Sequence, residues 1–348
     1  MGRSYLRPIG LSYGAAAVRA VGRGQAGRLG GHMAIAFHAV EMIERRNGDV
    51  FRDIIPYSDV AKSDALARIE EKRWFRALSR DIHPAVMGVV NVTPDSFSDG
   101  GLHADADKAI THGAALAAEG ATILDVGGES TRPGSEAISE ELESQRVVPV
   151  IEALAAKGFC VSCDTRKASV MRAAAKAGAA IINDVSALQY DAASLETAVG
   201  SRLPVVLMHA QGDPRTMQLN PAYQDVALDI YDYLEARIAS VRAAGVELAA
   251  VDPGIGFGKT FRHNLDVLNQ LTLFHGLGVP LLVGLSRKGF VGALTGEKAA
   301  GQRAHGSVGG AIHAALNGAH ILRVHDVKAT VAALAVALAA ADPGSSGL

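Results

Sequence analysis

Hydrophobic and polar positions follow two alternating patterns along most of the chain, and these patterns predict its secondary structure. Short, almost continuously apolar runs are typical of strands buried on both faces. Longer segments whose apolar residues recur at helical spacing separate these runs. The expected strands are Val86 to Val92, Ala121 to Val126, Cys160 to Asp164, Ala179 to Val185, Pro204 to Met208, Leu248 to Asp252, Pro280 to Leu285 and His320 to His325. The expected helices include Asp105 to Glu119, Glu140 to Lys157, Lys167 to Lys176, Val226 to Ala244 and Lys328 to Ala341.

This alternation indicates parallel βαβ units, and the expected strands number eight. Eight such units within roughly 260 residues fit a single TIM (β/α)8 barrel of the α/β class. We expect the barrel to occupy residues 81–348. An open, doubly wound sheet is the alternative, because the same strand and helix order also suits that fold.

Residues 1–80 precede the pattern, and we expect them to form a partly disordered N-terminal extension. Its first part, Met1 to His32, is rich in Gly, Arg and Ala, and no acidic residue occurs before Glu41. Such a composition is typical of a targeting peptide or an unstructured leader. One helix is expected at Asp64 to Leu78, and its apolar residues could dock on another element. We find no candidate catalytic cluster in the extension.

Composition and charge argue against several classes of protein. Hydrophobic residues make up 49% of the chain and charged residues 20%, which is an ordinary globular profile. The net charge of -2 argues against nucleic-acid binding, so an anionic ligand has to be met by locally placed Arg, Lys or helix N-termini. No apolar run approaches the ~20 residues that cross a bilayer. The two cysteines, Cys160 and Cys163, lack a second Cys or His pair for a metal site, and reduced cysteines suit a cytoplasmic protein.

The carboxyl ends of the expected strands are unusually polar. In chain order they carry Asn91, Asp125 with Glu129, Asp164, Asn183, Met208 with His209, Asp252, Ser286 to Lys288, and Arg323 with His325. A buried polar group costs free energy unless it is hydrogen-bonded, so a purely structural barrel would not need one at nearly every strand. Function in (β/α)8 barrels sits at this end of the strands. We therefore expect an active site there.

Two subsets of these residues predict two kinds of contact. Strand parity places Arg323 and His325 on one face, and such a pair beside a loop with Thr131 and Arg132 suits an anion such as a phosphate. The second subset consists of Asp164, Asn183, Asp252 and Lys288. Two carboxylates, an amide and an ammonium can hydrogen-bond a flat heterocycle that carries both donors and acceptors.

The run from Gly254 to Thr260 is similar to a nucleotide-binding P-loop but does not match it. The motif requires a glycine where Pro253 stands, before Gly258. The dinucleotide fingerprint also fails, because Lys259 occupies the position of its last glycine. The glycines are expected to let the backbone approach a planar ligand, with Phe257 as a stacking wall, or else to form a plain tight turn.

Five segments, read in order, resemble the dihydropteroate synthase family. They are Asn91 to Gly101 (NVTPDSFSDGG), Gly127 to Gly134 (GGESTRPG), Asp252 to Lys259 (DPGIGFGK), Ser286 to Lys288 (SRK) and Arg323 to Val327 (RVHDV). The resemblance implies an enzyme of folate biosynthesis, a sulfonamide target, that joins 6-hydroxymethyl-7,8-dihydropterin diphosphate to para-aminobenzoate by an SN1-like displacement and releases diphosphate. It also implies Mg²⁺ as cofactor and a homodimer.

The resemblance further implies a role for each matching residue. It implies a metal contact from Asn91 and catalytic roles for Asp95, Asp164, Lys288, Arg323 and His325. Substrate-binding roles are implied for Ser96, Phe97, Thr131, Arg132, Pro133, Asn183, Met208, Asp252, Phe257 and Gly284. A pterin-dependent methyltransferase is the alternative, because that related barrel looks similar around the pterin pocket. It would not need Arg323 with His325, since no diphosphate departs.

Overall fold

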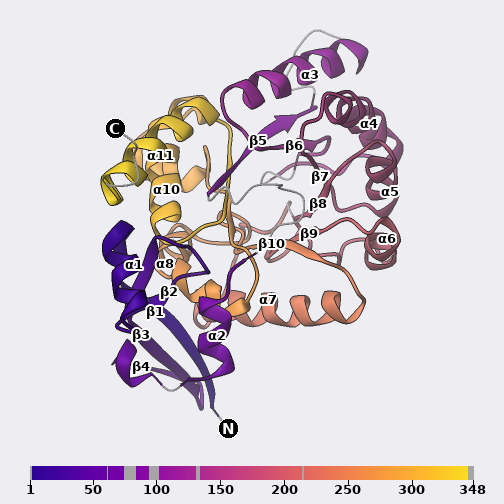
Figure 1. Ribbon diagram of the computed structural model, residues 1–348. Helices are drawn as coiled ribbons and strands as arrows, with labels where there is room; N and C mark the ends of the chain where they lie inside the picture. Colours follow the sequence, from indigo (N-terminus) through magenta and orange to yellow (C-terminus); the bar gives the residue numbers. More distant parts are fainter. Residues whose placement is uncertain are drawn as a thin grey trace.

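The eight expected strands form one parallel sheet that closes on itself. The computed structural model describes residues 2–60, 62–73, 84–93, 102–130, 134–213 and 215–343. Within this part of the chain the strand order is β10-β9-β8-β7-β6-β5-β12-β11, and a parallel bridge between Val251 and Leu281 joins the two ends of the sheet. Figure 1 shows the helices arranged around this sheet. The predicted (β/α)8 barrel is therefore confirmed, and the open-sheet alternative is wrong.

Each barrel strand overlaps an expected one, usually with shorter ends. The strands are β5 (Ala85–Asn91), β6 (Ile123–Gly127), β7 (Val161–Asp164), β8 (Ile181–Asp184), β9 (Val205–Met208), β10 (Leu248–Asp252), β11 (Leu282–Val283) and β12 (Ile321–Val324). The surrounding α-helices are α3 (Leu102–Ala118), α4 (Glu140–Ala156), α5 (Ala168–Lys176), α6 (Ser194–Ser201), α7 (Val226–Ala243), α8 (Phe261–Asn269), α9 (Gly289–Thr295), α10 (Ala304–Leu316) and α11 (Val327–Ala341). Two 3-10 helices, η3 (Leu271–Leu277) and η4 (Ala300–Arg303), complete this part.

Several helices begin at side chains that satisfy the first backbone N–H groups. Ser139 Oγ accepts from Leu142 N at the start of α4, and Asp225 accepts from two backbone amides at the start of α7. Helix α8 begins with a capping box between Thr260 and His263. Such caps stabilise a helix by about 1 kcal/mol each, and they fix where the chain leaves the loop that follows each strand.

Two hydrophobic layers lie on opposite faces of the strands. The inner layer fills the barrel and includes Met87, Ile123, Ile181, Val206 and Ile321. The outer layer packs the strands against the helices. Cys160 contacts the inner layer whereas Cys163 belongs to the outer one, so the two free thiols point to opposite faces of the sheet.

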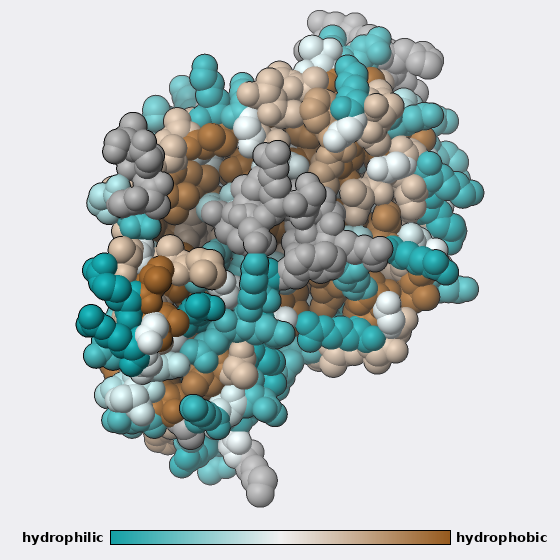
Figure 2. Space-filling model, in the orientation of Figure 1, coloured by the Kyte–Doolittle hydropathy of each residue, from teal (hydrophilic) through white to brown (hydrophobic). Residues whose placement is uncertain are grey.

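The N-terminal residues form a second, antiparallel sheet. Its strands are β1 (Arg3–Tyr13), β2 (Gly27–Arg28), β3 (Ile35–Arg46) and β4 (Asp49–Pro56), and the sheet is accompanied by α1 (Gly14–Gly22), η1 (Tyr57–Asp59) and α2 (Asp64–Glu70). Strand β3 pairs along most of its length with β1 and also with β2 and β4. Figure 2 shows, at the lower left, that the outer surface of this N-terminal part is largely hydrophilic with a few hydrophobic patches. The expectation of an unstructured leader is wrong.

The leader expectation failed because the acidic partners of the early arginines come from elsewhere in the chain. Arg7 pairs with Glu41 on β3 at 2.9 Å, and Arg3 pairs with Asp232 on α7 at 3.0 Å. The composition of Met1 to His32 therefore includes the arginines of these ion pairs but not their acidic partners, which lie outside this segment. The expected helix at Asp64 to Leu78 is present over Asp64–Glu70 but ends there, because Glu71 has an extended backbone, and Glu71 to Arg73 are not helical. Trp74 to Leu78 lie outside the described residues.

The antiparallel sheet is docked on the barrel by buried contacts. Tyr5 is only 3% exposed, its ring packs edge-to-face on Tyr231 with centroids 5.5 Å apart, and its hydroxyl donates to Asp232 at 2.9 Å. Nearby, Arg45 contacts Asp229 at 2.7 Å. Tyr5 also belongs to the hydrophobic cluster that packs the barrel helices. Tyr5 and Ile43 of the antiparallel sheet thus join the outer layer of the barrel, whereas Leu29, Phe37 and Ile69 belong to a separate cluster within the extension.

These contacts lie at the end of the barrel where the strands begin. The His320 ring accepts from Leu281 N at 3.0 Å through Nδ1, and its Nε2 lies 3.0 Å from Gly30 O, which requires Nε2 to donate. His320 immediately precedes β12, and its carbonyl accepts from Ala85 N at the start of β5. The extension therefore covers the end of the barrel opposite the polar strand ends.

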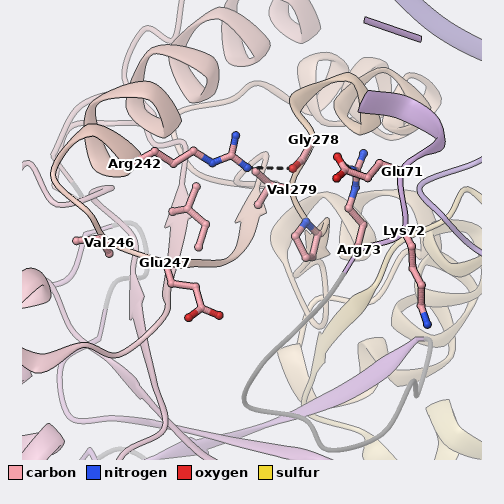
Figure 3. A pocket seen from close by; sticks show the side chains of 10 residues that line it. Glu71, Lys72, Arg73, Arg242, Val246, Glu247, Gly278 and Val279 are labelled. Carbon is pink, nitrogen blue, oxygen red and sulfur yellow. Dashed lines mark hydrogen bonds and ion pairs between the residues drawn. The ribbon is translucent and has the colours of Figure 1, made fainter. Parts of the chain in front are cut away.

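A cavity of about 450 Å³ opens beside this junction (Figure 3). It is lined by Glu71, Lys72, Arg73, Arg242, Val246, Glu247, Leu248, Gly278, Val279 and Pro280. The lining residues of β10 and β11 come from the start of these strands or just before it, and Arg242 is held by a bond to Gly278 O at 3.1 Å. This cavity is consequently remote from the chemistry expected at the carboxyl ends.

No helix in the described ranges is long and apolar enough to cross a membrane.

We predict that removing the Tyr5 side chain loosens the extension without affecting turnover. Tyr5→Ala should lower the free energy of unfolding by about 3 kcal/mol, because it creates a cavity and removes a buried hydrogen bond. Chemical denaturation measures this change. Phe51→Ala is the matched control, since Phe51 is 55% exposed. An equal loss in both variants, or a lower kcat in Tyr5→Ala, would contradict the prediction.

Candidate functional site

The polar residues at the top of the barrel lie one side-chain step above its apolar inner layer. Successive side chains of a strand alternate between faces, so the residue two positions after an inward apolar residue also points inward. Ile123 is thus followed by Asp125, and Ile321 by Arg323. The same relation gives Val89, Ser162, Asn183, Met208, Asp252 and Gly284 on the other six strands. The strand period alone therefore collects a polar layer at one end of the barrel.

Arg323 joins two aspartates across this layer. Its Nε donates to Asp125 Oδ2 at 2.6 Å, and its Nη2 donates to Asp164 Oδ2 at 2.7 Å. Asp125 is fully buried, and the side chain of Asp164 is 11% exposed. One guanidinium between two carboxylates leaves a net negative charge in a poorly solvated place. A ligand that develops positive charge would be stabilised here.

The protonation of these groups is shifted by their burial and their proximity. Burial raises the pKa of Asp164 to about 7, against the lowering effect of Arg323. Burial acts to lower the pKa of Arg323, but the carboxylates of Asp125 and Asp164 outweigh it and raise that pKa above its usual range. Arg323 therefore stays charged, whereas Asp164 changes charge close to neutral pH.

Asp125 is the residue that the sequence-based assignment left out. Its Oδ2 accepts from both Arg323 and Asn183 Nδ2, the latter at 3.0 Å. Its Oδ1 is buried and has no donor within the described residues. A buried acceptor without a donor is costly, so this oxygen suits an N–H group of a ligand. The signal was its position at the end of β6, but the resemblance assigned it no role.

Asp252 lies in the same polar layer, next to a space that Gly284 leaves unfilled. Its Oδ1 accepts from Gly254 N at 2.7 Å, which fixes the carboxylate. A Cβ at Gly284 would lie 3.6 Å from Asp252 Oδ2 and 3.5 Å from Arg323 Cβ, so Gly284 leaves room between them. Met208 is a buried neighbour of Gly254 and forms an apolar side of this space. Burial raises the pKa of Asp252, against the effect of the nearby Lys288.

Lys288 enters the same space from the loop after β11. Its Nζ donates to Ile255 O and stands over the Phe257 ring, 4.4 Å from the centroid. Burial lowers the pKa of Lys288 to about 8, although Asp252 acts in the opposite direction. Phe257 thus contacts the ammonium with its ring face, and the two side chains form one wall.

His325 lies at the rim next to the loop that carries Lys288. Ser286 Oγ contacts His325 Nδ1 at 3.1 Å and accepts from His325 N at 3.2 Å, so the imidazole is held in one orientation. Arg287, which follows Ser286, has a left-handed backbone with φ of 59°. Its Nε donates to Asp326, the residue after His325, at 3.0 Å. Such strain in a non-glycine residue costs of order 1–3 kcal/mol and is common at functional sites.

The two subsets predicted from the sequence form a single network. Arg323 was expected to serve an anion together with His325, but it also bonds directly to Asp164 of the heterocycle subset. Asn91 ends β5 opposite Gly127 of β6, on the same edge of the sheet. The predicted residues Asp95, Ser96, Phe97, Thr131, Arg132 and Pro133 lie outside the described residues.

Glu129 does not belong to this network, although the sequence placed it among the polar strand ends. Its carboxylate accepts from Arg166 Nη2 at 2.8 Å and from Lys167 Nζ at 2.6 Å. Lys167 also contacts Glu143 at 2.6 Å. All four side chains are at least nine-tenths buried, and their charges cancel. Glu129 therefore secures the loop after β6 from behind instead of facing a ligand.

Several curated proteins and solved structures similar to this chain are dihydropteroate synthases. The dihydropteroate synthase of Escherichia coli (strain K12) is 49% identical over 269 residues, which cover 76% of this chain and 95% of that protein. A structure of Xanthomonas albilineans dihydropteroate synthase with 4-aminobenzoic acid is 49% identical, with a TM-score of 0.70 and coverage of 74% and 93%. Another, in complex with 7,8-dihydropteroate, is 46% identical, with a TM-score of 0.68 and coverage of 75% and 95%.

The match to a family profile agrees with these relatives and with the polar layer. The profile described as "Pterin binding enzyme" covers residues 87–325, from Met87, the third residue of β5, to the rim residue His325. That span contains every contact of the network described above. The chain therefore belongs to the pterin-binding enzyme family, among its dihydropteroate synthases.

Proposed function

We propose that the polar layer of the barrel carries out the dihydropteroate synthase reaction on a buried pterin ring. The ring of 6-hydroxymethyl-7,8-dihydropterin diphosphate lies between Asp252, Asn183 and Lys288, with Met208 and Phe257 as walls and Gly284 below. A carboxylate matches an amidine-like N–H pair in bidentate fashion, and the amide and ammonium complement the remaining ring atoms. The open floor beside Asp252 and its fixed carboxylate support this placement.

The reaction begins with departure of the diphosphate. The C–O bond breaks heterolytically, diphosphate takes the electron pair, and the carbon left behind is conjugated with the pterin ring, so positive charge spreads over the ring. Asp164 and Asp125 supply the negative environment that stabilises this cation. Arg323 and His325 at the rim bind the leaving diphosphate, since a guanidinium can donate to phosphate oxygens while it still holds the aspartates.

Para-aminobenzoate then attacks through its amine nitrogen. The nitrogen lone pair forms the new C–N bond, and the nitrogen loses one proton to diphosphate or water. An aromatic amine is neutral at pH 7, so no strong general base is required. By family likeness alone, we assign para-aminobenzoate to Asp95, Ser96, Phe97, Thr131, Arg132 and Pro133.

Mg²⁺ fits the donors at the rim. The amide oxygen of Asn91 is a hard ligand of the kind that Mg²⁺ prefers. The described residues contain no group of three His, Cys, Asp or Glu that could hold a metal by themselves. Mg²⁺ usually keeps few protein ligands and takes phosphate oxygens of the substrate, so this donor set suits it. When bound, the ion would neutralise charge that develops on the diphosphate.

The Arg323 bridge between two buried aspartates is the observation on which this proposal depends. A direct assay of dihydropteroate and diphosphate formation from both substrates, with and without Mg²⁺, tests it. A pterin-dependent methyltransferase would release no diphosphate and would transfer a methyl group instead. Absence of both products in the presence of Mg²⁺ would overturn the proposal.

We also propose a homodimer that forms through α10 and α11. Helix α11 exposes Val336 by 71% and Leu338 by 39%, and apolar side chains of this kind are typical of an interface. The small residues of Gly306 to Asn317 and Val331 to Ala341 would allow close helix approach. A cytoplasmic location stays a prediction, which the two free cysteines support.

Two opposed ionisations should confine activity to a narrow pH range. Asp164 has to be ionised, so activity falls as pH drops through about 7, whereas Lys288 has to be protonated, so activity falls as pH rises through about 8. We expect a bell-shaped profile of kcat/KM, and Lys288→Arg should move its alkaline limb upward because a guanidinium does not titrate there. The exposed Lys328→Arg is the control. An unchanged alkaline limb in Lys288→Arg would contradict this assignment.

Asp252→Asn should weaken pterin binding by about 2–4 kcal/mol. The amide replaces a buried acceptor oxygen by N–H, so a donor of the ligand is left facing a donor of the protein. Calorimetric titration with a pterin measures the loss. Asp107→Asn, on the exposed side of α3, serves as the matched control. Near-wild-type affinity in Asp252→Asn would remove this residue from the pterin site.

Val336→Asp should convert the dimer to a monomer. A charge at the centre of an apolar interface loses its solvation without gaining a partner. Light scattering at micromolar concentration measures the mass. Val199→Asp is the control, because Val199 is 43% exposed on α6, away from α10 and α11 (Figure 1). A monomeric wild-type protein, or an unaltered dimer in Val336→Asp, would contradict the proposed interface.

A further inference from the structure

Lys259 is a buried lysine that the proposed mechanism does not use. It lies in the run from Gly254 to Thr260 that is similar to a P-loop, yet it is only 2% exposed. Its Nζ donates to Gly254 O at 2.8 Å and to Phe257 O at 3.0 Å, and it lies 3.0 Å from His209 Nδ1. All three contacts are inside the protein. Lys259 therefore does not reach a phosphate, and its partners show what it holds instead.

The backbone around Lys259 needs an internal donor. Gly254 and Gly258 have left-handed φ values of 69° and 60°, and a Cβ at either position would collide with the carbonyl of His209 or Gln211. The turn is thus pressed against the loop after β9. Carbonyl groups in such a turn cannot join a sheet, and a buried carbonyl without a donor costs free energy. The amino group of Lys259 donates to Phe257 O and adds a second donor to Gly254 O, which also accepts from Phe257 N at 3.1 Å.

The two carbonyls held by Lys259 flank the part of the turn that contacts Lys288. Ile255 O accepts from Lys288 Nζ, and the Phe257 ring lies 4.4 Å from the same nitrogen. Gly254 O and Phe257 O are the acceptors of Lys259 on either side of these contacts. A shift of the turn would consequently move the Phe257 wall and the acceptor of Lys288 together.

We infer that Lys259 is a positioning residue of the pterin site, which acts by fixing the turn that carries Ile255 O and Phe257 against Lys288. This inference rests on the proposed function, in which Phe257 and Lys288 border the pterin. His209 completes the arrangement, because its Nδ1 can accept from a protonated Lys259 or donate to a neutral one. Burial lowers the pKa of both Lys259 and His209 well below their usual ranges, and the contact persists in either protonation state.

Lys259→Met tests the inference, because methionine has a similar length and no donor. We expect pterin affinity to fall about tenfold or more, since displacement of a site wall by about 1 Å has effects of this size. The KM for para-aminobenzoate should change much less. The alkaline limb of the kcat/KM profile should move upward, because Lys288 in a looser site is better solvated and its pKa returns toward the usual value. A merely structural residue would not move that limb. Circular dichroism and thermal unfolding establish that the variant is folded.

A matched pair at His209 keeps the inference testable if Lys259→Met does not fold. His209→Asn retains a polar atom near the position of Nδ1, whereas His209→Leu removes it. We expect His209→Leu to lose several times more pterin affinity than His209→Asn. Equal affinities in the two variants would overturn the inference.

Phe257→Leu separates a failure of the inference from a failure of the proposed site. If Phe257→Leu weakens pterin binding but folded Lys259→Met leaves the affinity and the alkaline limb unchanged, the inference is wrong and the pterin site stands. If neither variant affects pterin binding, Phe257 is not a wall of the site, and the inference falls with that placement. Weaker binding in both variants, with less than additive losses in the double variant, supports Lys259 as a residue that acts through Phe257.

Discussion

The guanidinium of Arg323, held between the carboxylates of Asp125 and Asp164, is the contact on which the top of the barrel depends. Removing three charged groups from water is costly, and only their mutual attraction and hydrogen bonds offset that cost. The three residues stand on β12, β6 and β7, so the contact exists only because the sheet curves round with β5 between β12 and β6. Two carboxylates against one cation leave the site negative. This imbalance is a poor way to stabilise a fold and a suitable way to stabilise a cationic transition state.

The polar layer and the contacts that join the extension to the barrel lie at opposite ends of the barrel. The inner strand residues below the network are apolar, and at the far end the barrel shares its core with the antiparallel sheet through Tyr5 and its neighbours. The strained residue of the described site loop, Arg287, stands at the top. The extension therefore packs on the end of the barrel where the strands begin, opposite the end at which a ligand is expected to bind. None of the network residues lines the cavity at this junction.

The loops that follow the strands are secured in two different ways. Behind the loop after β6, Glu129 is neutralised by Arg166 and Lys167, a pairing of charges that is satisfied in the absence of any ligand. Behind the turn after β10, Lys259 supplies donors to backbone carbonyls. In both cases the cationic side chains, Arg166 with Lys167 and Lys259, bind partners inside the protein and do not face the polar layer, although residues near them do. A charged residue near a strand end is thus not by itself a ligand contact, and its partners decide its role.

The sequence by itself determined the number of barrel strands, the order of elements and the face on which each strand residue lies, because these follow from local periodicity. Parity correctly placed Arg323 inward above Ile321, and the run of polar strand ends correctly predicted that polar side chains gather at the carboxyl end of the barrel. Tertiary structure decided which charges meet. Arg323 and Asp125 are 198 positions apart, so the sequence did not show that Asp125 meets Arg323, nor that Glu129 in the loop after the same strand pairs with Arg166 and Lys167 instead. The extension was misjudged for the same reason, since the carboxylates that pair with Arg3 and Arg45 stand on α7. Local pattern encodes direction and period, whereas charge pairing depends on the closure of the chain, which brings distant residues within a few ångströms.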